Sequence, residues 1–331
     1  MYVISLSNGA QFSSDPGESI LDAAARANVA MAYSCRTGRC SSCKCKVLKG
    51  DSSALQHESG LGDEEAVQGW ILGCVRSATT DMTLEVEDLS GLDLPPVKTL
   101  PCRVHTLEKL APDVIKVVLR LPPSADFRFL PGQYIDVIGP GSARRSYSLA
   151  NADAKDKLLE LHIREVPGGT MSEYWFSKCK VNDLLRLNGP LGVFALRNIE
   201  GRDLVFLATG TGIAPVKSML ESLDVLPAES RPRSVAVYWG GRTPADLYWD
   251  MNSVAAAHRF TPVLSKGDAS WAGARGYVQE ALTKEKSDFS HAIVYACGSP
   301  SMIRSAREVL VGAGLSEKHF VSDAFVCSAT L

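Results

Sequence analysis

The sequence predicts a multidomain protein of mixed α+β and α/β class: a β-rich N-terminal unit, a six-stranded antiparallel barrel and a doubly wound parallel sheet. Three observations lead to this prediction. The chain has 331 residues, enough for two or three domains. Apolar residues alternate in several segments of the first 200 positions, as in half-buried strands. From about residue 203, strand patterns alternate with helical ones, as in parallel sheets.

The N-terminal unit is expected over residues 1–90. It contains alternating strands at residues 2–7 and 82–86, a return strand at 11–14 after an Asn-Gly turn, and a helix beginning after Ser19. Residues 91–101 hold three prolines and one glycine, which indicates a semi-rigid linker. Ninety residues is an ordinary size for a separate domain.

The barrel is expected over residues 102–199 and the parallel sheet over 200–331. Strands at 115–121, 134–138 and 159–163 predict the barrel, with a helix at 171–179. Apolar strands at 203–208, 234–239, 260–264 and 292–296, separated by helical patterns, predict the doubly wound sheet.

Composition excludes several classes of protein. The net charge is -2 with 22% charged residues, so a nucleic-acid partner is not indicated. With 45% hydrophobic residues the chain is neither disordered nor collagen-like. The sequence has no apolar run long enough to span a membrane, and its start lacks the pattern of a signal peptide. We therefore expect a soluble, cytoplasmic protein.

Four of the nine cysteines predict an iron–sulfur site. Cys35, Cys40 and Cys43 follow the spacing C-x4-C-x2-C, and Cys74 supplies a distant fourth thiolate, which is the plant-type pattern for a [2Fe–2S] cluster. The residues between them are small, polar or flexible, so the loop can wrap a cluster and direct backbone N–H groups at its sulfurs.

Other interpretations of these cysteines fit less well. Structural zinc sites usually contain two short Cys pairs, and a Rieske centre needs two His ligands, which this segment lacks. An odd number of cysteines without an export signal argues against a disulfide framework. Four of the other five cysteines are given no ligand role. Cys45 is expected to be a bystander, and Cys102, Cys179 and Cys327 are expected to be buried small residues.

Two further motifs suggest nucleotide binding. Gly210-Thr211-Gly212 follows a strand and opens a helix, where a phosphate can bind backbone N–H groups, but a tight turn without a ligand explains it equally well. In the barrel, Arg145 offers a phosphate contact, Tyr147 a flat face for a flavin and Ser148 a hydroxyl for a ring nitrogen. Without context, an ordinary strand explains this second motif.

The motifs together resemble the ferredoxin-reductase superfamily in its oxygenase-reductase arrangement, over essentially the whole chain. The similar stretches are YSCRTGRCSSC, PGQY at 131–134, RSYS at 145–148, GTGIAP at 210–215, YWGGRT at 238–243 and YACGSPSM at 295–302. RRSYSLAN, GTGIAPVKSML, YACGSPSMI and SDAFV are most similar to the subgroup of CDP-6-deoxy-glucoseen reductases, which serve 3,6-dideoxysugar synthesis.

The resemblance implies a β-grasp ferredoxin domain, a flavin barrel and a nicotinamide domain. It implies that FAD contacts Arg145, Tyr147, Ser148 (near N5), Gly169 and Ser172, and that the nicotinamide dinucleotide contacts Gly210, Thr211, Gly212, Gly240, Arg242, Cys297 and Gly298. Of these, Ser148 and Cys297 would lie beside the reacting rings, although Cys297 is also explained as a small residue ending a buried strand. Phe325 is followed by six residues, so we do not expect it to stack on the flavin as a terminal aromatic residue.

These cofactors imply electron transfer from NADH through FAD and [2Fe–2S] to a partner protein, because a flavin can accept a hydride and release single electrons. Three functions are consistent with this chemistry. The partner is a CDP-4-dehydro-6-deoxyglucose dehydratase or an oxygenase component, or the protein is a nucleotide-binding redox sensor. NADH is expected over NADPH because only Arg242 is available to a 2′-phosphate and Asp246 would repel it. Arg36, Arg39, Lys44 and Lys46, if exposed, would form a basic docking rim.

Overall fold

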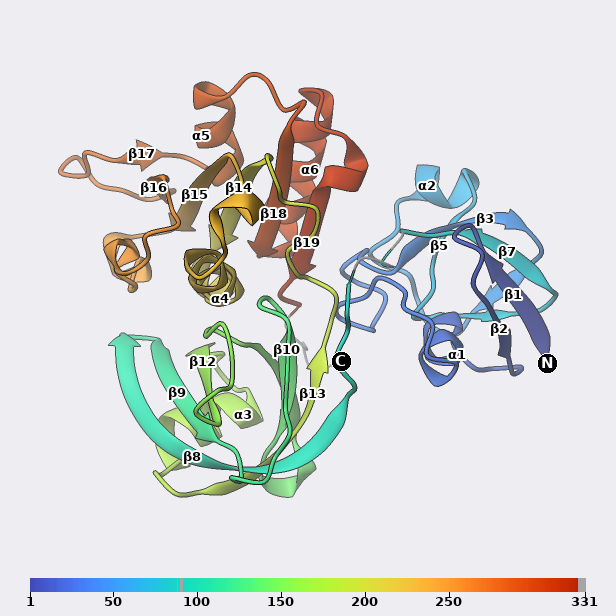
Figure 1. Ribbon diagram of the computed structural model, residues 1–331, viewed down its shortest axis with the longest axis horizontal. Coiled ribbons are helices and arrows are strands. Elements are labelled where there is room, and N and C mark those ends of the chain that lie inside the picture. The colour runs from blue at the N-terminus through green and yellow to red at the C-terminus, as the bar shows by residue number, and fades with distance from the viewer. Residues whose placement is uncertain (88, 90–91, 327–331) are drawn as a thin grey trace. The chain divides into compact units, whose positions relative to one another are not determined.

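The structure is a computed structural model that describes residues 1–87, 89 and 92–326 (Figure 1). Residues Met1–Asp93, together with the described residues from Asp323 onwards, belong to one compact unit. Residues Leu94–Ser322 form a second, which contains the barrel and almost all of the parallel sheet. The expectation for Cys327 lies outside the described residues. Among the described helices, none has the length and apolar character needed to cross a membrane.

The N-terminal unit is built on a mixed five-stranded sheet. Its order is β2-β1-β7-β3-β5, with β1 and β7 parallel and the other pairs antiparallel, which is a β-grasp arrangement. The elements are β1 (Tyr2–Leu6), β2 (Gln11–Ser14), α1 (Ile20–Arg26), β3 (Lys44–Lys49), β4 (Ser52–Ala54), α2 (Asp63–Val67), β5 (Trp70–Leu72), β6 (Arg76–Ala78) and β7 (Met82–Glu85). The predicted strands and hairpin are confirmed.

Helix α1 covers the core of this unit. Its N-cap is Ser19, whose Oγ accepts a hydrogen bond from the Asp22 amide at 3.0 Å. Ile20 and Leu21 are buried at the start of the helix, where they pack into the same core cluster as Ile4. The cap and the adjacent apolar pair therefore fix where the helix begins and which of its faces is turned to the core.

The barrel is a six-stranded antiparallel sheet in the order β11-β10-β13-β8-β9-β12. Leu149 bridges Leu161 and thereby links the two ends of this sheet. The elements are β8 (Lys98–Ala111), β9 (Val114–Arg120), β10 (Tyr134–Ile138), β11 (Arg144–Ser148), β12 (Leu158–Arg164), α3 (Thr170–Glu173), the π-helical turn η2 (Tyr174–Lys178) and β13 (Leu184–Leu191). Strand β8 begins within the predicted linker.

The second sheet of this unit has the order β17-β16-β15-β14-β18-β19. Its central pairs are parallel, and the connections leave β14 in both directions, so the sheet is doubly wound as predicted. The elements are β14 (Asp203–Thr209), α4 (Ile213–Asp224), β15 (Ser234–Gly241), β16 (Arg259–Leu264), β17 (Ala274–Arg275), α5 (Val278–Glu285), β18 (Ala292–Gly298), α6 (Pro300–Gly312) and β19 (Phe320–Ala324). Helix α4 contacts β14 and β18, and α5 packs against α6.

Candidate functional site

The four predicted cluster ligands come together as two pairs of thiols. Cys35 and Cys40 share a hydrogen bond within the loop between α1 and β3, and Cys43 shares one with Cys74, which follows β5. The shared bonds lower the pKa of Cys35 to about 5 and raise that of Cys40, and they act in the same way on Cys74 and Cys43 respectively. One thiolate in each pair is thus favoured.

This donor set fits a [2Fe–2S] cluster. In the described part of the chain, no group of three or more His, Cys, Asp or Glu side chains is spaced to hold a single ion. Two thiol pairs instead suit two irons, each of which takes two thiolates. Backbone amides already point at the sulfurs, because Thr37 N lies 3.4 Å from Cys35 Sγ and Cys35 N lies 3.4 Å from Cys40 Sγ. Such donors tune the potential of a bound cluster.

Glycine is required where the cysteine loop turns. Gly38 has φ +71°, and a Cβ there would lie 3.0 Å from the His57 carbonyl oxygen. The adjacent backbone of Gly60 is close enough to Arg39 that a Cβ would lie 2.7 Å from its carbonyl carbon. The loop is therefore packed against residues 57–60. Cys45, by contrast, is buried beneath it, and burial raises its thiol pKa to about 12, as expected for a bystander.

The cations of the predicted basic rim largely have partners within their own domain. Arg36 pairs with Asp22, and Lys44 Nζ lies 2.6 Å from a Glu65 carboxylate oxygen and 4.8 Å from the centroid of the Trp70 ring. Lys44 and Lys46 are also only partly exposed. The rim thus carries less free positive charge than the sequence suggests.

The predicted flavin residues lie on β11. Side chains alternate along a strand, so Arg145 and Tyr147 share one face and Ser148 lies on the other, opposite Tyr134 of β10. Arg145 is exposed, and its Nη1 donates to the Arg144 carbonyl oxygen at 2.7 Å. Its remaining guanidinium donors are available to a phosphate.

Tyr147 is held by a residue that sequence reasoning missed. Trp175 Nε1 donates to the Tyr147 hydroxyl at 2.9 Å, and the two rings meet edge to face with centroids 6.2 Å apart. Burial raises the pKa of Tyr147 to about 12, so the hydroxyl stays protonated. Trp175 lies in η2, directly after α3, and nothing in its own sequence neighbourhood marks it as a partner of β11.

The turn predicted to hold a pyrophosphate precedes α3. Gly169 is the N-cap of this four-residue helix, and Ser172 Oγ accepts a hydrogen bond from the Val166 amide at 2.8 Å. The Ser172 hydroxyl thus closes its own turn. Through Trp175, the segment that follows this turn packs beside Tyr147, so the structure brings the two halves of the predicted FAD site into one neighbourhood.

The predicted dinucleotide residues gather at the carboxyl ends of three adjacent parallel strands. Thr209 pairs with Gly240 of β15, and Ala208 pairs with Cys297 of β18. This edge is where ligands bind in open α/β sheets. Gly210 begins the turn with φ +55°, and Trp239 Nε1 donates to its carbonyl oxygen at 3.0 Å.

Two glycines at this edge are also required by packing. A Cβ on Gly212 would lie 2.3 Å from the Cys297 carbonyl oxygen, and a Cβ on Gly298 would lie 2.2 Å from Thr209 Oγ1. Both distances are far below van der Waals contact. The turn after β14 therefore sits directly against the end of β18, and Cys297, a candidate beside the nicotinamide, is fully buried there.

Arg164 is a second residue that the sequence did not reveal. It ends β12 of the barrel, and its guanidinium carbon would lie 3.6 Å from a Cβ on Gly210. Its Nη2 lies 2.9 Å from Asp246 Oδ1, and its Nε lies 3.4 Å from Asp113. An arginine of the barrel thus lies beside the turn at Gly210–Gly212, which we call the dinucleotide turn because it is predicted to contact the dinucleotide.

The pairing with Arg164 changes the argument about Asp246. Its other oxygen accepts hydrogen bonds from the amides of Arg242 and Thr243 at 3.0 and 2.9 Å. Burial would raise the pKa of Asp246, but these donors and Arg164 outweigh it and lower the pKa. The Asp246 carboxylate is ionised, but Arg164 and the two amides offset its charge. It therefore repels a 2′-phosphate less than an isolated carboxylate would. The Arg242 side chain is exposed.

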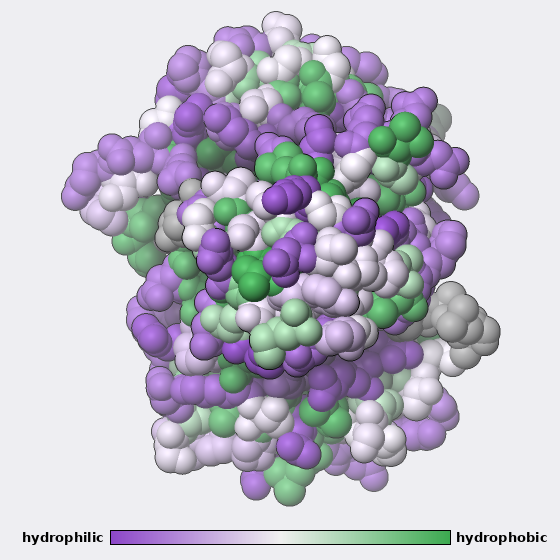
Figure 2. All heavy atoms as spheres, turned by 90° about the vertical axis from the view of Figure 1, so that its right-hand side faces the viewer, coloured by the Kyte–Doolittle hydropathy of each residue, from purple (hydrophilic) through white to green (hydrophobic). Residues whose placement is uncertain are grey.

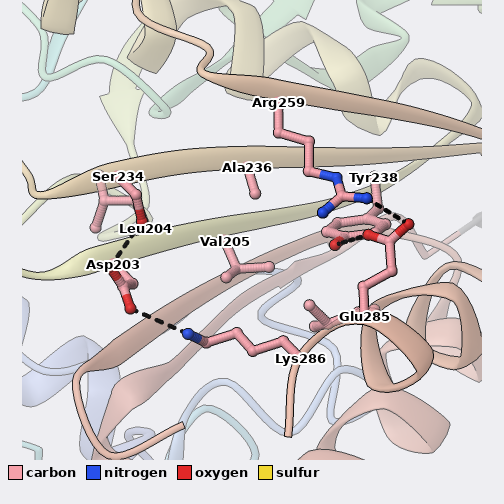
Figure 3. Close-up of a pocket in the computed structure, with 10 residues that line it drawn as sticks. Asp203, Leu204, Val205, Ser234, Ala236, Tyr238, Arg259, Glu285 and Lys286 are labelled. Atoms are coloured by element: carbon pink, nitrogen blue, oxygen red, sulfur yellow. Dashed lines mark hydrogen bonds and ion pairs between the residues drawn. The ribbon is translucent and has the colours of Figure 1, made fainter. Parts of the chain in front are cut away.

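A cavity of about 220 Å³ lies elsewhere on the parallel sheet (Figure 3). Its lining includes Asp203, Ser234 and Arg259, the first residues of β14, β15 and β16, so it lies at the amino ends of the strands. The charges in it are paired: Lys286 lies 3.0 Å from Asp203, and Glu285 lies 2.8 Å from Arg259. No residue predicted for a cofactor lines this cavity.

Comparison with known proteins assigns each part of the chain. Residues 4–79 match the 2Fe-2S iron-sulfur cluster binding domain, residues 101–196 the oxidoreductase FAD-binding domain, and residues 206–308 the oxidoreductase NAD-binding domain. CDP-6-deoxy-L-threo-D-glycero-4-hexulose-3-dehydrase reductase of Yersinia pestis is 41% identical over 97% of both chains. Reductase component 1 of terephthalate 1,2-dioxygenase from Comamonas is 31% identical over 95% of this chain and 94% of its own.

The architecture is shared with a solved reductase. The crystal structure of the Amycolatopsis cytochrome P450 reductase GcoB superposes with a TM-score of 0.77 and 31% identity, and covers 98% of this chain and 99% of that one. The similarity therefore extends over all three predicted parts.

Proposed function

The chain belongs to the ferredoxin-reductase family of the oxygenase-reductase type, and we propose that it supplies electrons to a sugar-nucleotide dehydratase in 3,6-dideoxysugar synthesis. As an oxidoreductase of this family it uses NADH, FAD and a [2Fe–2S] cluster. The observation that carries the proposal is the 41% identity over 97% of both chains with a reductase named for such a dehydrase. In this proposal the partner dehydratase, and not this chain, acts on the sugar nucleotide, which is CDP-4-dehydro-6-deoxyglucose.

In this function each set of residues has a distinct task. Cys35, Cys40, Cys43 and Cys74 would hold the cluster; Arg145, Tyr147, Ser148, Gly169 and Ser172 would hold FAD; and Gly210, Thr211, Gly212, Gly240, Arg242, Cys297 and Gly298 would hold NADH. When bound, FAD supplies the exchange between a two-electron hydride and single electrons. The chain's own work is to bind and orient, since hydride transfer requires no general base. Ser148 and Cys297 are proposed to lie at the reacting rings.

A protein acceptor follows from the domain composition. A small substrate that takes hydride needs only a flavin, whereas a covalently attached ferredoxin domain delivers single electrons to a client. On the face drawn in Figure 2, hydrophobic residues form small groups among hydrophilic ones rather than one continuous apolar patch. A transient and largely polar complex fits such a surface. We place it in the cytoplasm, where NADH and reducing conditions are available.

A coupled assay tests the proposal. The protein is incubated with NADH, the pyridoxamine-dependent iron–sulfur dehydratase and CDP-4-dehydro-6-deoxyglucose, and formation of the 3,6-dideoxy product is followed across a salt series. We expect product formation that weakens as salt rises. The second candidate is a reductase component of an oxygenase, favoured by the relative named for terephthalate dioxygenase. Absence of product together with efficient reduction of an oxygenase component would establish that alternative.

A further inference from the structure

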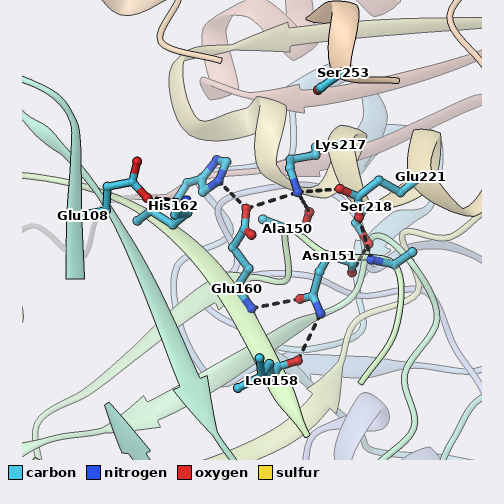
Figure 4. Close-up of polar contacts among 12 residues, drawn as sticks. Glu108, Ala150, Asn151, Leu158, Glu160, His162, Lys217, Ser218, Glu221 and Ser253 are labelled. Atoms are coloured by element: carbon cyan, nitrogen blue, oxygen red, sulfur yellow. Dashed lines mark hydrogen bonds and ion pairs between the residues drawn. The ribbon is translucent and has the colours of Figure 1, made fainter. Parts of the chain in front are cut away.

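A partly buried hydrogen-bond network ties the segment after β11 to helix α4 (Figure 4). Lys217 Nζ is its centre: it donates to the Ala150 carbonyl oxygen at 3.0 Å and lies 3.1 Å from Glu160 and 2.6 Å from Glu221. Glu160 belongs to β12 of the barrel, and Lys217 and Glu221 are one turn apart on α4. One ammonium group thus joins three segments.

Further bonds hold the same segment on both sides. Ser218 Oγ donates to the Asn151 carbonyl oxygen at 2.7 Å, and Glu221 Oε2 accepts from the Ala152 amide at 3.1 Å. On the barrel side, Asn151 Oδ1 accepts from the Glu160 amide at 2.9 Å. Residues 150–152 are therefore hydrogen-bonded both to α4 and to β12. Neither α4 nor β12 can slide against this segment without breaking several bonds.

In this network one ammonium group faces two carboxylates, and all three are only partly exposed to water. The Lys217 side chain is 12% exposed and that of Glu160 is 21% exposed. Burial opposes ionisation of Glu160, but the hydrogen bond from His162 and the charge of Lys217 outweigh it and lower the Glu160 pKa to about 2. His162 Nε2 lies 2.9 Å from Glu160 Oε1. Removing Lys217 would leave two partly buried carboxylates without their cation, which destabilises their present arrangement.

The ends of the network lie close in sequence to the two predicted cofactor motifs. Ala150 is two residues after Ser148, the last residue of β11, and Lys217 is five residues after Gly212, on the helix that the dinucleotide turn opens. A strand end and a helix are stiff over such short lengths. If α4 shifted against residues 150–152, the turn at Gly210–Gly212 would move with the helix. Its distance from β11 would then change.

We propose that Lys217 is a positioning residue for hydride transfer: by joining Ala150, Glu160 and Glu221, it fixes the separation between the flavin-binding strand and the dinucleotide turn. This inference rests on the proposed electron transfer from NADH to FAD, but not on the identity of the acceptor protein. Hydride transfer is steeply sensitive to distance, and a misplacement of about 1 Å is able to cost about 100-fold in rate.

Three variants test this role in the full-length, FAD-loaded protein. Lys217→Met keeps the length of the side chain and removes its charge, and Lys217→Arg keeps the charge. Lys98→Met is the matched control, because Lys98 Nζ pairs with Asp126 at 2.9 Å on another part of the barrel. Flavin reduction is measured in single turnovers with NADH and with 4-deuterated NADH. Hydrogen–deuterium exchange of residues 149–152 and 210–221 is measured without NADH.

For Lys217→Met we expect flavin reduction slowed by about 10- to 100-fold, with NADH affinity within about twofold of the wild type. The deuterium isotope effect should rise, exchange should accelerate in both segments, and Lys217→Arg should recover most of the rate. Lys98→Met should resemble the wild type. Unchanged flavin reduction and exchange in Lys217→Met would overturn the proposal, as would a loss explained entirely by weaker NADH binding or by lost FAD. If Lys217→Met does not fold, a Lys217→Arg variant with wild-type exchange but a 10-fold slower rate would overturn it too.

The outcome is separable from that of the proposed function. Single-turnover reduction and exchange require neither the dehydratase nor its sugar nucleotide. Failure of the coupled assay with a positive result here would reject the acceptor and keep the positioning role. If NADH does not reduce the flavin of the wild type at all, the proposed electron path fails first.

Discussion

Replacing either of two adjacent arginines on β11 tests the flavin site directly. Arg144 and Arg145 are neighbours on one strand, so their side chains leave it on opposite faces. Arg145 shares its face with Tyr147, whereas Arg144 Nη1 lies 3.4 Å from Asp136. Both are exposed, which makes Arg144→Ala a control for Arg145→Ala in charge, size and location.

The expected magnitude follows from the contact that would be lost. A hydrogen bond between a guanidinium and a phosphate is worth about 1.5–3 kcal/mol, and about 1.4 kcal/mol corresponds to a factor of ten in affinity. Arg145→Ala should therefore weaken FAD binding by about 10- to 100-fold. Arg144→Ala loses a long, exposed ion pair, which is worth at most about 1 kcal/mol of stability, and should leave the FAD affinity within about twofold.

The assay is a titration of the flavin-free protein with FAD and, separately, with FMN, followed by the change in flavin fluorescence. FAD should bind more tightly than FMN, because the turn at Gly169 and Ser172 is proposed to hold the pyrophosphate. Equal FAD affinities of the two arginine variants would refute the assignment of Arg145. FMN recovered from the native protein would refute the choice of FAD.

Three other outcomes are expected. Cys40→Ala should lose the [2Fe–2S] absorption but keep FAD and NADH–ferricyanide activity, whereas Cys45→Ala should keep the cluster; an intact cluster spectrum in the first variant would remove Cys40 from the ligands. Steady-state kcat/KM should favour NADH over NADPH, and Arg242→Ala should lower the value for NADPH further; a preference for NADPH would reverse this expectation. Burial outweighs the hydrogen bond from Glu160 and holds the His162 pKa below 6.5, and that of Glu160 lies at about 2 instead of 4.5, so the unfolded chain binds more protons in acid. The unfolding free energy should thus fall below pH 6.5 and again between pH 4.5 and 2. Because the His319 pKa is lowered as well, urea unfolding of His162→Gln should show a smaller first fall rather than none, and a wild-type profile there would contradict the assignment.

The coming together of the four cysteines and the strand pattern could be predicted because both signals are local. The spacing of Cys35, Cys40 and Cys43 encodes the loop itself, and alternation along β9 or β10 encodes which side chains face the core. The sequence predicts the position of the helix at residues 171–179 correctly, but not its type. The chain forms four α-helical residues followed by a π-helical turn, and this is the turn that carries Trp175 to Tyr147.

The residues that the sequence did not reveal act across long separations. Arg164 meets Asp246, and Lys217 meets Glu160, only because β12 of the barrel lies against the parallel-sheet domain. Each of these side chains is an ordinary charged residue of a strand, loop or helix when considered alone. Neither spacing nor periodicity relates such pairs, since their geometry depends on how two folded sheets pack.

In the dinucleotide turn, glycine is explained both by close packing and by the approach of a phosphate to the backbone. From the sequence, Gly210-Thr211-Gly212 is explained either by a phosphate that approaches the backbone or by a tight turn without a ligand. The structure gives Gly212 a packing reason, because any Cβ would collide with the Cys297 carbonyl oxygen. The two explanations are compatible, because packing that fixes the turn against β18 also fixes the direction of its amides. The dinucleotide proposed to bind here would therefore require little rearrangement of the turn, and the entropy of ordering it would be lost during folding rather than at each encounter.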